Sequence, residues 1–151
     1  MKESFSLDVK KPRREVFDSL TDVHRLAGLS NGAVTISPVP DRPRAGKGAA
    51  FLIKPAVNGP GPAEVLCETT QWDPPSLCTR RFAIPDLPVT AALRFEDIEG
   101  GTRVTVDLEL EPQSLLYKMM LPALALKLKS DKDKLLAQFQ QELAKQPRQL
   151  P

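Results

Sequence analysis

The clearest structural pattern in this sequence is the stretch VTAALRFEDIEGGTRVTVDLEL, residues 89–110. In its second half, Val104, Val106 and Leu108 alternate with charged or hydroxyl side chains, the period-2 pattern of a strand with one buried face. Between the halves, the segment EGG at 99–101 supplies the glycines that a tight hairpin turn requires. The stretch therefore predicts an antiparallel hairpin with one face toward the core and one toward water.

The chain before this hairpin predicts further strands, interrupted by two short helices. Alternating residues at 5–9 indicate a first strand, and Pro12 suits the first turn of a helix whose apolar face carries Val16, Phe17 and Leu20. The other expected elements are a second short helix at 24–29, capped by Asp22, and strands at 33–37, 48–54, 63–72 and 77–84.

The residues after Pro112 change to a helical pattern. Because proline disfavours helical geometry in the residue before it, Pro122 predicts a short helix near 114–120 and a separate long helix from 122 onward. The apolar stripe of the long helix would consist of Leu124, Leu128, Leu135, Phe139 and Leu143. The sequence thus predicts an α+β domain with an antiparallel sheet of six to seven strands and one C-terminal helix long enough to cover it.

Length and composition indicate a single globular domain. A chain of 151 residues, 41% hydrophobic and 26% charged, buries about 70% of its unfolded surface. The net charge is +2 without a basic stripe, so nucleic-acid binding is not expected. No apolar run of about 18 residues and no apolar leader occurs, so neither a transmembrane segment nor a signal peptide is expected. Cys67 and Cys78 are expected as reduced thiols of a cytoplasmic protein, with a cross-strand disulfide as the alternative.

Residue types that carry catalysis or hold metals are sparse. His24 is the only histidine, and its predicted place at a helix start beside Arg25 favours a solvated surface role over that of a catalytic base. No spacing of His, Cys or carboxylates matches a metal site, so no metal, no cofactor and no catalytic residue is expected. Glu64 and Glu68 would share one face of a strand, either as paired acid–base groups or, more simply, on the outer wet face.

Three segments together resemble the START-related helix-grip superfamily (SRPBCC), which includes polyketide cyclase-like and lipid-transport proteins. PRREVFDSLTD at 12–22 is similar to its first proline and helix, WDPP at 72–75 to a turn between central strands, and the apolar run 115–136 to its lid-and-helix segment. Many relatives carry a tryptophan at the end of the second helix, where this chain has residues 27–29 (AGL). The resemblance implies a curved sheet wrapped around the C-terminal helix, in one START-like domain (1–146) with a short tail (147–151).

The resemblance also implies a cavity between the concave face of the sheet and the long helix. Strict alternation through 77–84 places Arg80 on the same face as Cys78 and Phe82. In an apolar cavity this cation would suit a carboxylate or phosphate head group. A β-bulge would instead turn Arg80 into water, because a slip of one residue exchanges the two faces of a strand. The sequence leaves both arrangements open.

Apolar residues of the sheet and of the lid-and-helix segment would line the rest of this cavity, and methionines there would adapt to varied ligand shapes. The alternative is that the same residues pack as a solid core. The predicted ligand-binding set is Phe51, Ile53, Val65, Arg80, Phe82, Ala91, Leu93, Tyr117, Met119, Met120, Ala123 and Leu124.

These features favour a protein that binds or carries a small hydrophobic molecule, such as a lipid, a fatty acid or a polyketide-like compound. A minority of the superfamily catalyses cyclisation or dehydration, so such an enzyme acting on an apolar substrate, with Arg80 and Tyr117 as polar groups, is the main alternative. A third hypothesis is that the apolar segment 115–128, with Lys118, Lys127 and Lys129, docks on a membrane or a partner. The sequence does not indicate an oligomeric state.

Overall fold

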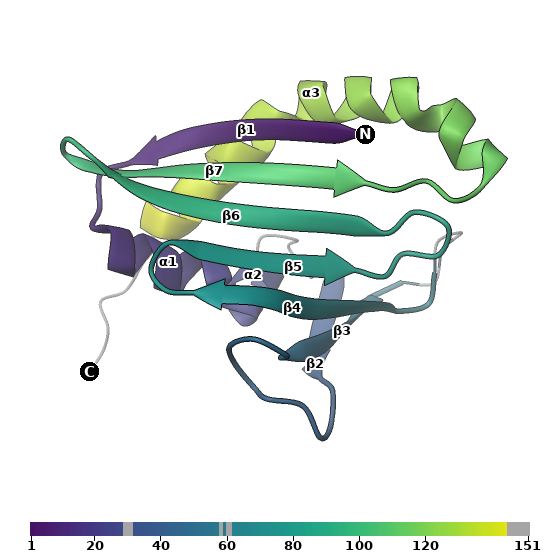
Figure 1. The fold of residues 1–151 in the computed structure, drawn as a ribbon, viewed down its shortest axis with the longest axis horizontal. Coiled ribbons are helices and arrows are strands. Elements are labelled where there is room, and N and C mark those ends of the chain that lie inside the picture. Colours follow the sequence, from purple (N-terminus) through teal and green to yellow (C-terminus); the bar gives the residue numbers. More distant parts are fainter. Residues whose placement is uncertain (29–31, 58, 60–61, 145–151) are drawn as a thin grey trace.

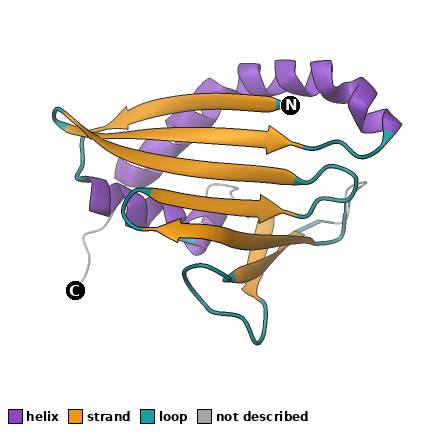
Figure 2. Cartoon of the chain, in the orientation of Figure 1, coloured by secondary structure: helices purple, strands orange, loops and turns teal. Residues whose placement is uncertain are grey.

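The computed structural model of the protein describes residues 1–28, 32–57, 59 and 62–144, and a few helical residues within these ranges by their backbone alone. This part of the chain forms one antiparallel sheet of seven strands, in the order β1-β7-β6-β5-β4-β3-β2, together with three helices (Figures 1 and 2). The strands are β1 (Lys2–Val9), β2 (Val34–Pro38), β3 (Ala50–Pro55), β4 (Val65–Asp73), β5 (Leu77–Phe82), β6 (Val89–Ile98) and β7 (Gly101–Leu110). The helices are α1 (Arg13–Thr21), α2 (Val23–Gly28) and α3 (Leu115–Ala144). The predicted α+β helix-grip architecture is confirmed.

The sheet is curved, and the helices lie on one side of it. In Figure 1, α1, α2 and the yellow C-terminal part of α3 lie behind the strands, whereas the green first part of α3 runs past the edge strand β1. The contacts agree with this view, because α3 packs against β1 and α1 packs against β6 and β7. We call the side of the sheet that faces these helices the concave face.

Strand pairing brings the alternating apolar residues of neighbouring strands together on the concave face. Phe5 of β1 lies opposite Val106 of β7, and Val106 lies opposite Leu93 of β6. Leu93 in turn lies opposite Cys78 of β5. The period-2 pattern that predicted the strands thus also determines which residues share this face.

One bulge in β4 alters that alternation. The register between β4 and β5 shifts at Thr70, since Thr69 pairs with Arg80 whereas Gln71 pairs with Thr79. The extra residue brings Trp72 to the same face as Thr69, where strict alternation would put it on the opposite one.

Helix α1 fills one end of the concave face. Phe17 is fully buried, and its ring meets those of Phe95 and Trp72 edge-on, with centroids 5.0 and 5.1 Å apart. Val16 and Val104 are fully buried in the same cluster. We call these five residues the packed end of the concave face, because aromatic rings and branched side chains pack against one another there.

The C-terminal helix differs from its prediction. Residues 115–144 form one helix with Pro122 inside it, instead of a helix that stops at 120 and a second that starts at 122. The missing N–H of Pro122 leaves the carbonyl of Lys118 without its helical donor. Both residues are exposed, so water can satisfy that carbonyl and the helix continues. The predicted break was therefore wrong.

Parts of other predictions fall outside the described residues. The second helix, expected at 24–29, is observed as α2 up to Gly28, and Leu29 is not among the described residues. The tail 147–151 also lies outside them, as do the side chains of Leu128, Leu135, Phe139 and Leu143 in the predicted stripe of α3.

Candidate ligand-binding site

The concave face is hollow at the end away from Phe17. A cavity of about 340 Å³ lies there, between the sheet and helices α1 and α2, and we call it the apolar cavity. Its lining consists of Phe5, Leu20, Val23, Ala27, Val34, Ile36, Ile53, Cys67, Cys78, Arg80, Phe82, Ala91, Leu93, Val106 and Leu108. Arg80 is the single charged group among these lining residues.

Small side chains keep this space open. Ala91 stands in the middle of the concave face, opposite Arg80 of β5 and Leu108 of β7. Helix α2 contributes only Val23 and Ala27 to the lining. Close packing of the same region would need bulkier residues at these positions, as Phe17 provides at the packed end.

Arg80 is buried in the wall of the cavity without a described acidic partner. Its side chain is only 7% exposed. Nε donates to the Thr69 hydroxyl at 3.2 Å, and Nη2 donates to the backbone carbonyl of Thr21 at 2.8 Å. No described carboxylate lies within ion-pair distance of the guanidinium. The bulge at Thr70 belongs to β4, so β5 keeps its alternation and Arg80 faces the cavity, not water.

The two cysteines of the cavity wall are free thiols. Burial raises the pKa of Cys67 to about 11 and also raises the pKa of Cys78, and the nearby positive charge of Arg80 opposes this rise in both. Both thiols therefore remain protonated at neutral pH and act as small apolar groups.

A second, more polar pocket adjoins the apolar cavity and shares Arg80 and Val23 with it. Its volume is about 300 Å³, and we call it the polar pocket. It is lined by Asp18, Thr21, Asp22, Val23, His24, Arg44, Ala45, Gly46, Phe51, Trp72 and Arg80. Its acidic groups are already engaged, because Asp22 accepts the backbone N–H groups of His24 and Arg25 at 3.0 and 3.3 Å and Asp18 pairs with Arg14 at 3.4 Å.

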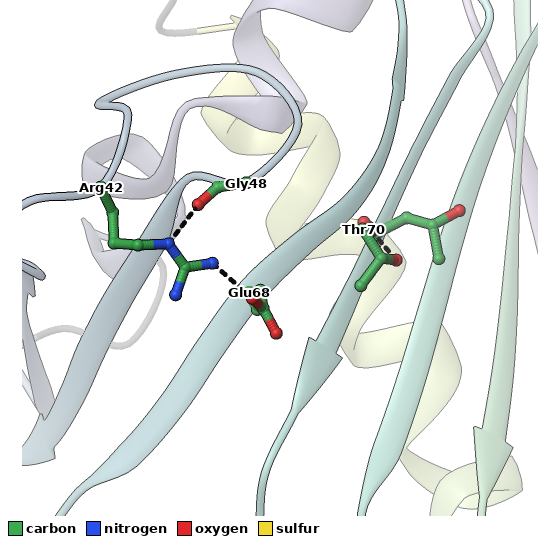
Figure 3. A network of polar contacts seen from close by, with 5 residues as sticks. Arg42, Gly48, Glu68 and Thr70 are labelled. Atoms are coloured by element: carbon green, nitrogen blue, oxygen red, sulfur yellow. Dashed lines mark hydrogen bonds and ion pairs between the residues drawn. The ribbon is translucent and has the colours of Figure 1, made fainter.

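An ion pair anchors the loop that carries one wall of the polar pocket. Arg42 Nε donates to the Gly48 carbonyl at 2.9 Å, and its Nη2 pairs with the Glu68 carboxylate (Figure 3). In the same view, the hydroxyl of the bulged Thr70 donates to the backbone carbonyl of Thr79 at 3.3 Å. These contacts tie residues 42–48 to β4.

Glu64 and Glu68 have separate ion-pair partners. Glu64 lies just before β4 and pairs with Lys54 at 3.8 Å, whereas Glu68 is held by Arg42. Neither carboxylate lines either pocket.

The structure brings together some of the predicted ligand-binding residues and not others. Ile53, Arg80, Phe82, Ala91 and Leu93 line the apolar cavity. Phe51 lines the polar pocket. Val65 is the strand partner of Ile53 but lines neither the apolar cavity nor the polar pocket. The residues expected from the helix, Tyr117, Met119, Met120, Ala123 and Leu124, line neither pocket.

Several lining residues were not in the predicted set. Val106 and Leu108 belong to the clean alternation of β7, and Val34 and Ile36 to that of β2, so the signal that found their strands could also have found them. Val23 and Ala27 carry no such signal, because their role depends on where α2 sits over the sheet.

The first half of α3 exposes an apolar surface. Met119 is 71% exposed and Leu115 is 74% exposed, and Leu116, Met120 and Leu126 are also exposed. This is the segment for which the sequence suggested docking, and that role stays a prediction. Among the residues that the structure describes, no helix combines the length and apolar character needed to cross a membrane. The described His, Cys, Asp and Glu side chains also form no cluster that could hold a metal ion.

The curved sheet, the helices on its concave face and the cavity between them define a helix-grip protein of the ligand-binding or cyclase-like class. Residues 4–144 match the family described as polyketide cyclase / dehydrase and lipid transport, and the chain belongs to this family. It is thus a member of the SRPBCC superfamily that the sequence motifs indicated. No curated protein matches the sequence.

Solved structures with the same fold cover nearly the whole chain. The protein TTHA0849 from Thermus thermophilus is 16% identical with a TM-score of 0.73, and the match covers 98% of this chain and 100% of that one. The protein MLL2253 from Mesorhizobium loti is 14% identical with a TM-score of 0.69, at 98% and 100% coverage. Norcoclaurine synthase from Thalictrum flavum, in complex with dopamine and hydroxybenzaldehyde, is 12% identical with a TM-score of 0.72, at 99% and 89% coverage. At these identities the likeness concerns the fold.

Proposed function

We propose that this protein binds or carries a small hydrophobic molecule in the apolar cavity, without transforming it. The observation that carries the proposal is the cavity itself, about 340 Å³ in volume and lined by apolar side chains apart from Arg80 and two protonated thiols. Ligand pockets in proteins range from about 300 to 1,000 Å³, so this volume suits a small ligand. Membership of a family that includes lipid transport proteins supports the same function.

The lining also favours binding over catalysis. General acid–base chemistry needs a group whose pKa lies near the working pH. Among the described residues of the apolar cavity, the titratable groups are Arg80 and thiols that burial holds protonated. None of these groups suits proton transfer at neutral pH, whereas all of them are compatible with holding an apolar molecule.

Native mass spectrometry tests this proposal. The protein is purified from a heterologous host, its native and denatured masses are compared, and any material lost on denaturation is extracted into organic solvent. We expect a reproducible added mass that extracts as a lipid or fatty acid. The protein is also incubated with a mixture of fatty acids and alcohols, which supplies ligands that the host does not make. No added mass under either condition would contradict the proposal.

A cyclase- or dehydratase-like enzyme is the second candidate function. It is favoured by the polar pocket, which brings His24 and Arg44 to the border of the apolar cavity beside Arg80. A substrate could then place its apolar part in the cavity and its reacting part among these groups. Once a substrate is found by screening, Arg80→Ala and His24→Ala should each reduce turnover at least tenfold or so if this function is correct. Unchanged turnover in both variants and in Tyr117→Phe would contradict the enzyme function.

A further inference from the structure

We propose that the ligand of the apolar cavity is an amphipathic carboxylate, whose apolar body fills the cavity and whose head group pairs with Arg80 where the cavity meets the polar pocket. This inference rests on the proposed binding function and adds the chemical class of the ligand. It has four grounds: the charge of Arg80, its free donors, its surroundings and its position.

The charge of Arg80 lacks a counterion in the described structure. An arginine always carries its charge in a protein, and a buried charge is costly unless an opposite charge compensates it. Arg80 is 7% exposed, yet its two hydrogen bonds go to neutral oxygens of Thr69 and Thr21. A ligand carboxylate would supply the missing negative charge.

The guanidinium also has N–H groups that donate to no acceptor among the described residues. Of its five N–H groups, two donate to Thr69 and Thr21, which leaves three without an acceptor among the described residues. The planar fork of a guanidinium matches the two oxygens of a carboxylate, and such charge-assisted hydrogen bonds are about twice as strong as neutral ones.

On the side of the apolar cavity, the described residues that line the wall around Arg80 include no carboxylate. Cys67 and Cys78 flank it as thiols that burial keeps protonated. The wall thus provides one positive charge, which a carboxylate neutralises. A phosphate monoester carries about −1.5 to −2 charges at neutral pH, more than Arg80 alone neutralises.

The position of Arg80 sets the orientation of the ligand. Arg80 lines both the apolar cavity and the polar pocket, so a head group bound to it lies on the boundary between them. Arg80 is the single charged group among the lining residues of the apolar cavity, whereas the polar pocket holds Asp18, Asp22 and Arg44 as well. A head group bound to Arg80 therefore has its apolar body on the side of Ala91 and Phe82.

Binding of paired probes that differ only in their head group tests the inference. Decanoate is compared with 1-decanol, and 2-naphthoate with 2-naphthylmethanol, by isothermal titration calorimetry at neutral pH. The proteins are the wild type, Arg80→Met, which keeps the bulk but removes the charge, and Arg81→Met. Arg81 is exposed and is the next residue of the same strand, on its opposite face, so it serves as the matched control.

We expect the wild type and Arg81→Met to bind the acid of at least one pair about tenfold or more tighter than its alcohol. In Arg80→Met this preference should vanish, because the affinity for the acid falls to that for the alcohol. Equal affinity of the wild type for acid and alcohol, or a preference that survives in Arg80→Met, would overturn the inference and leave the binding function intact. Failure of all four probes to bind would instead contradict the proposed function together with the inference.

Folding of the variant is controlled in the same experiment. Retained binding of the alcohol shows that Arg80→Met has kept its cavity. If Arg80→Met does not fold, Arg80→Gln replaces it, since glutamine is neutral and can still donate to Thr69 or Thr21. The same loss of acid preference is expected, and its persistence would again overturn the inference.

Discussion

The two ends of the concave face share strands β4, β6 and β7 and yet are built differently. At the packed end, Phe17 of α1 is fully buried and packs edge-on against the rings of Phe95 and Trp72. At the hollow end, Ala91 and the short side chains of α2 leave a cavity of about 340 Å³. Both ends present apolar side chains at every second position, so hydrophobic patterning alone does not distinguish a core from a binding site.

What distinguishes the two ends is side-chain volume and the helix that covers each of them. The packed end receives large aromatic residues from α1 and from the sheet, whereas the hollow end receives Val23 and Ala27 from the short helix α2. A fold of this kind can therefore divide one apolar surface into a part that stabilises the domain and a part that is available to a ligand.

The largest expected effect comes from truncating the packed end. Phe17→Ala removes a fully buried ring and both of its aromatic contacts, and we expect it to lower the free energy of unfolding by about 3–5 kcal/mol. Phe82→Ala removes the same ring from the cavity wall, where part of the side chain already borders empty space, and should cost only about 1–2 kcal/mol. Urea denaturation of both variants measures the difference. Equal losses would show that the two ends do not differ in packing.

The next effect concerns the apolar character of the hollow end. Burial raises the pKa of Cys67 from 9.0 in water to about 11, so the folded state holds the proton more tightly than the unfolded state does. This contribution to stability is fully present below pH 9, is lost as the pH rises to about 11, and amounts to about 2–3 kcal/mol.

Urea denaturation of the wild type and Cys67→Ala at a series of alkaline pH values measures this contribution. The wild type should lose more stability than the variant over that range. Cys78, whose pKa is also raised by burial, contributes to the pH dependence of stability in both proteins. Identical pH profiles would indicate that water reaches Cys67 freely and that the cavity is not apolar in solution.

A smaller effect is expected from adding bulk. Ala91→Leu places a larger side chain into the cavity and should change the free energy of unfolding by less than about 1 kcal/mol, while weakening ligand binding. Ala50→Leu adds the same bulk at a position that is 1% exposed and lines neither pocket, and should destabilise by about 1–2 kcal/mol. Thermal unfolding and probe binding of the two variants provide the comparison. Strong destabilisation by Ala91→Leu would mean that the hollow end is closed in solution.

The smallest effect should come from the outer face. Glu64 and Lys54 are both about half exposed and 3.8 Å apart, so Glu64→Gln should change the free energy of unfolding by less than about 0.5 kcal/mol. Binding of the hydrophobic probes should not change, since neither residue lines a pocket. Altered probe affinity in this variant would show that the site extends beyond the concave face.

The fold could be predicted from the sequence because its determinants are local. The alternation in β7 and the turn at 99–101 define a hairpin by themselves, and the proline before α1 marks the start of a helix. The prediction of a helix break at Pro122 was wrong because the rule for proline is also local. It does not take into account that water can satisfy the carbonyl of an exposed Lys118.

The site could be predicted only in part, because it depends on non-local geometry. Alternation within β5 placed Arg80 and Phe82 on one face, but it left open a bulge that would turn Arg80 into water, and only the structure places the bulge in β4. The bulge at Thr70, which brings Trp72 to the concave face, depends on pairing between two strands and leaves no pattern in either one. The contribution of α2 depends on how a short helix is placed over the sheet, and the sequence of the helix does not encode that placement by itself.

The most direct test of the central claim, that the hollow end of the concave face is the binding site, is methyl NMR of the labelled protein during titration with decanoate and 1-decanol. We expect chemical-shift changes at the methyl groups of Ile36, Ile53 and Ala91, which line the cavity, and none at Val16 of the packed end. Shift changes confined to the exposed Leu115 and Met119 of α3, or their absence at Ile36, Ile53 and Ala91 on saturation, would contradict the account.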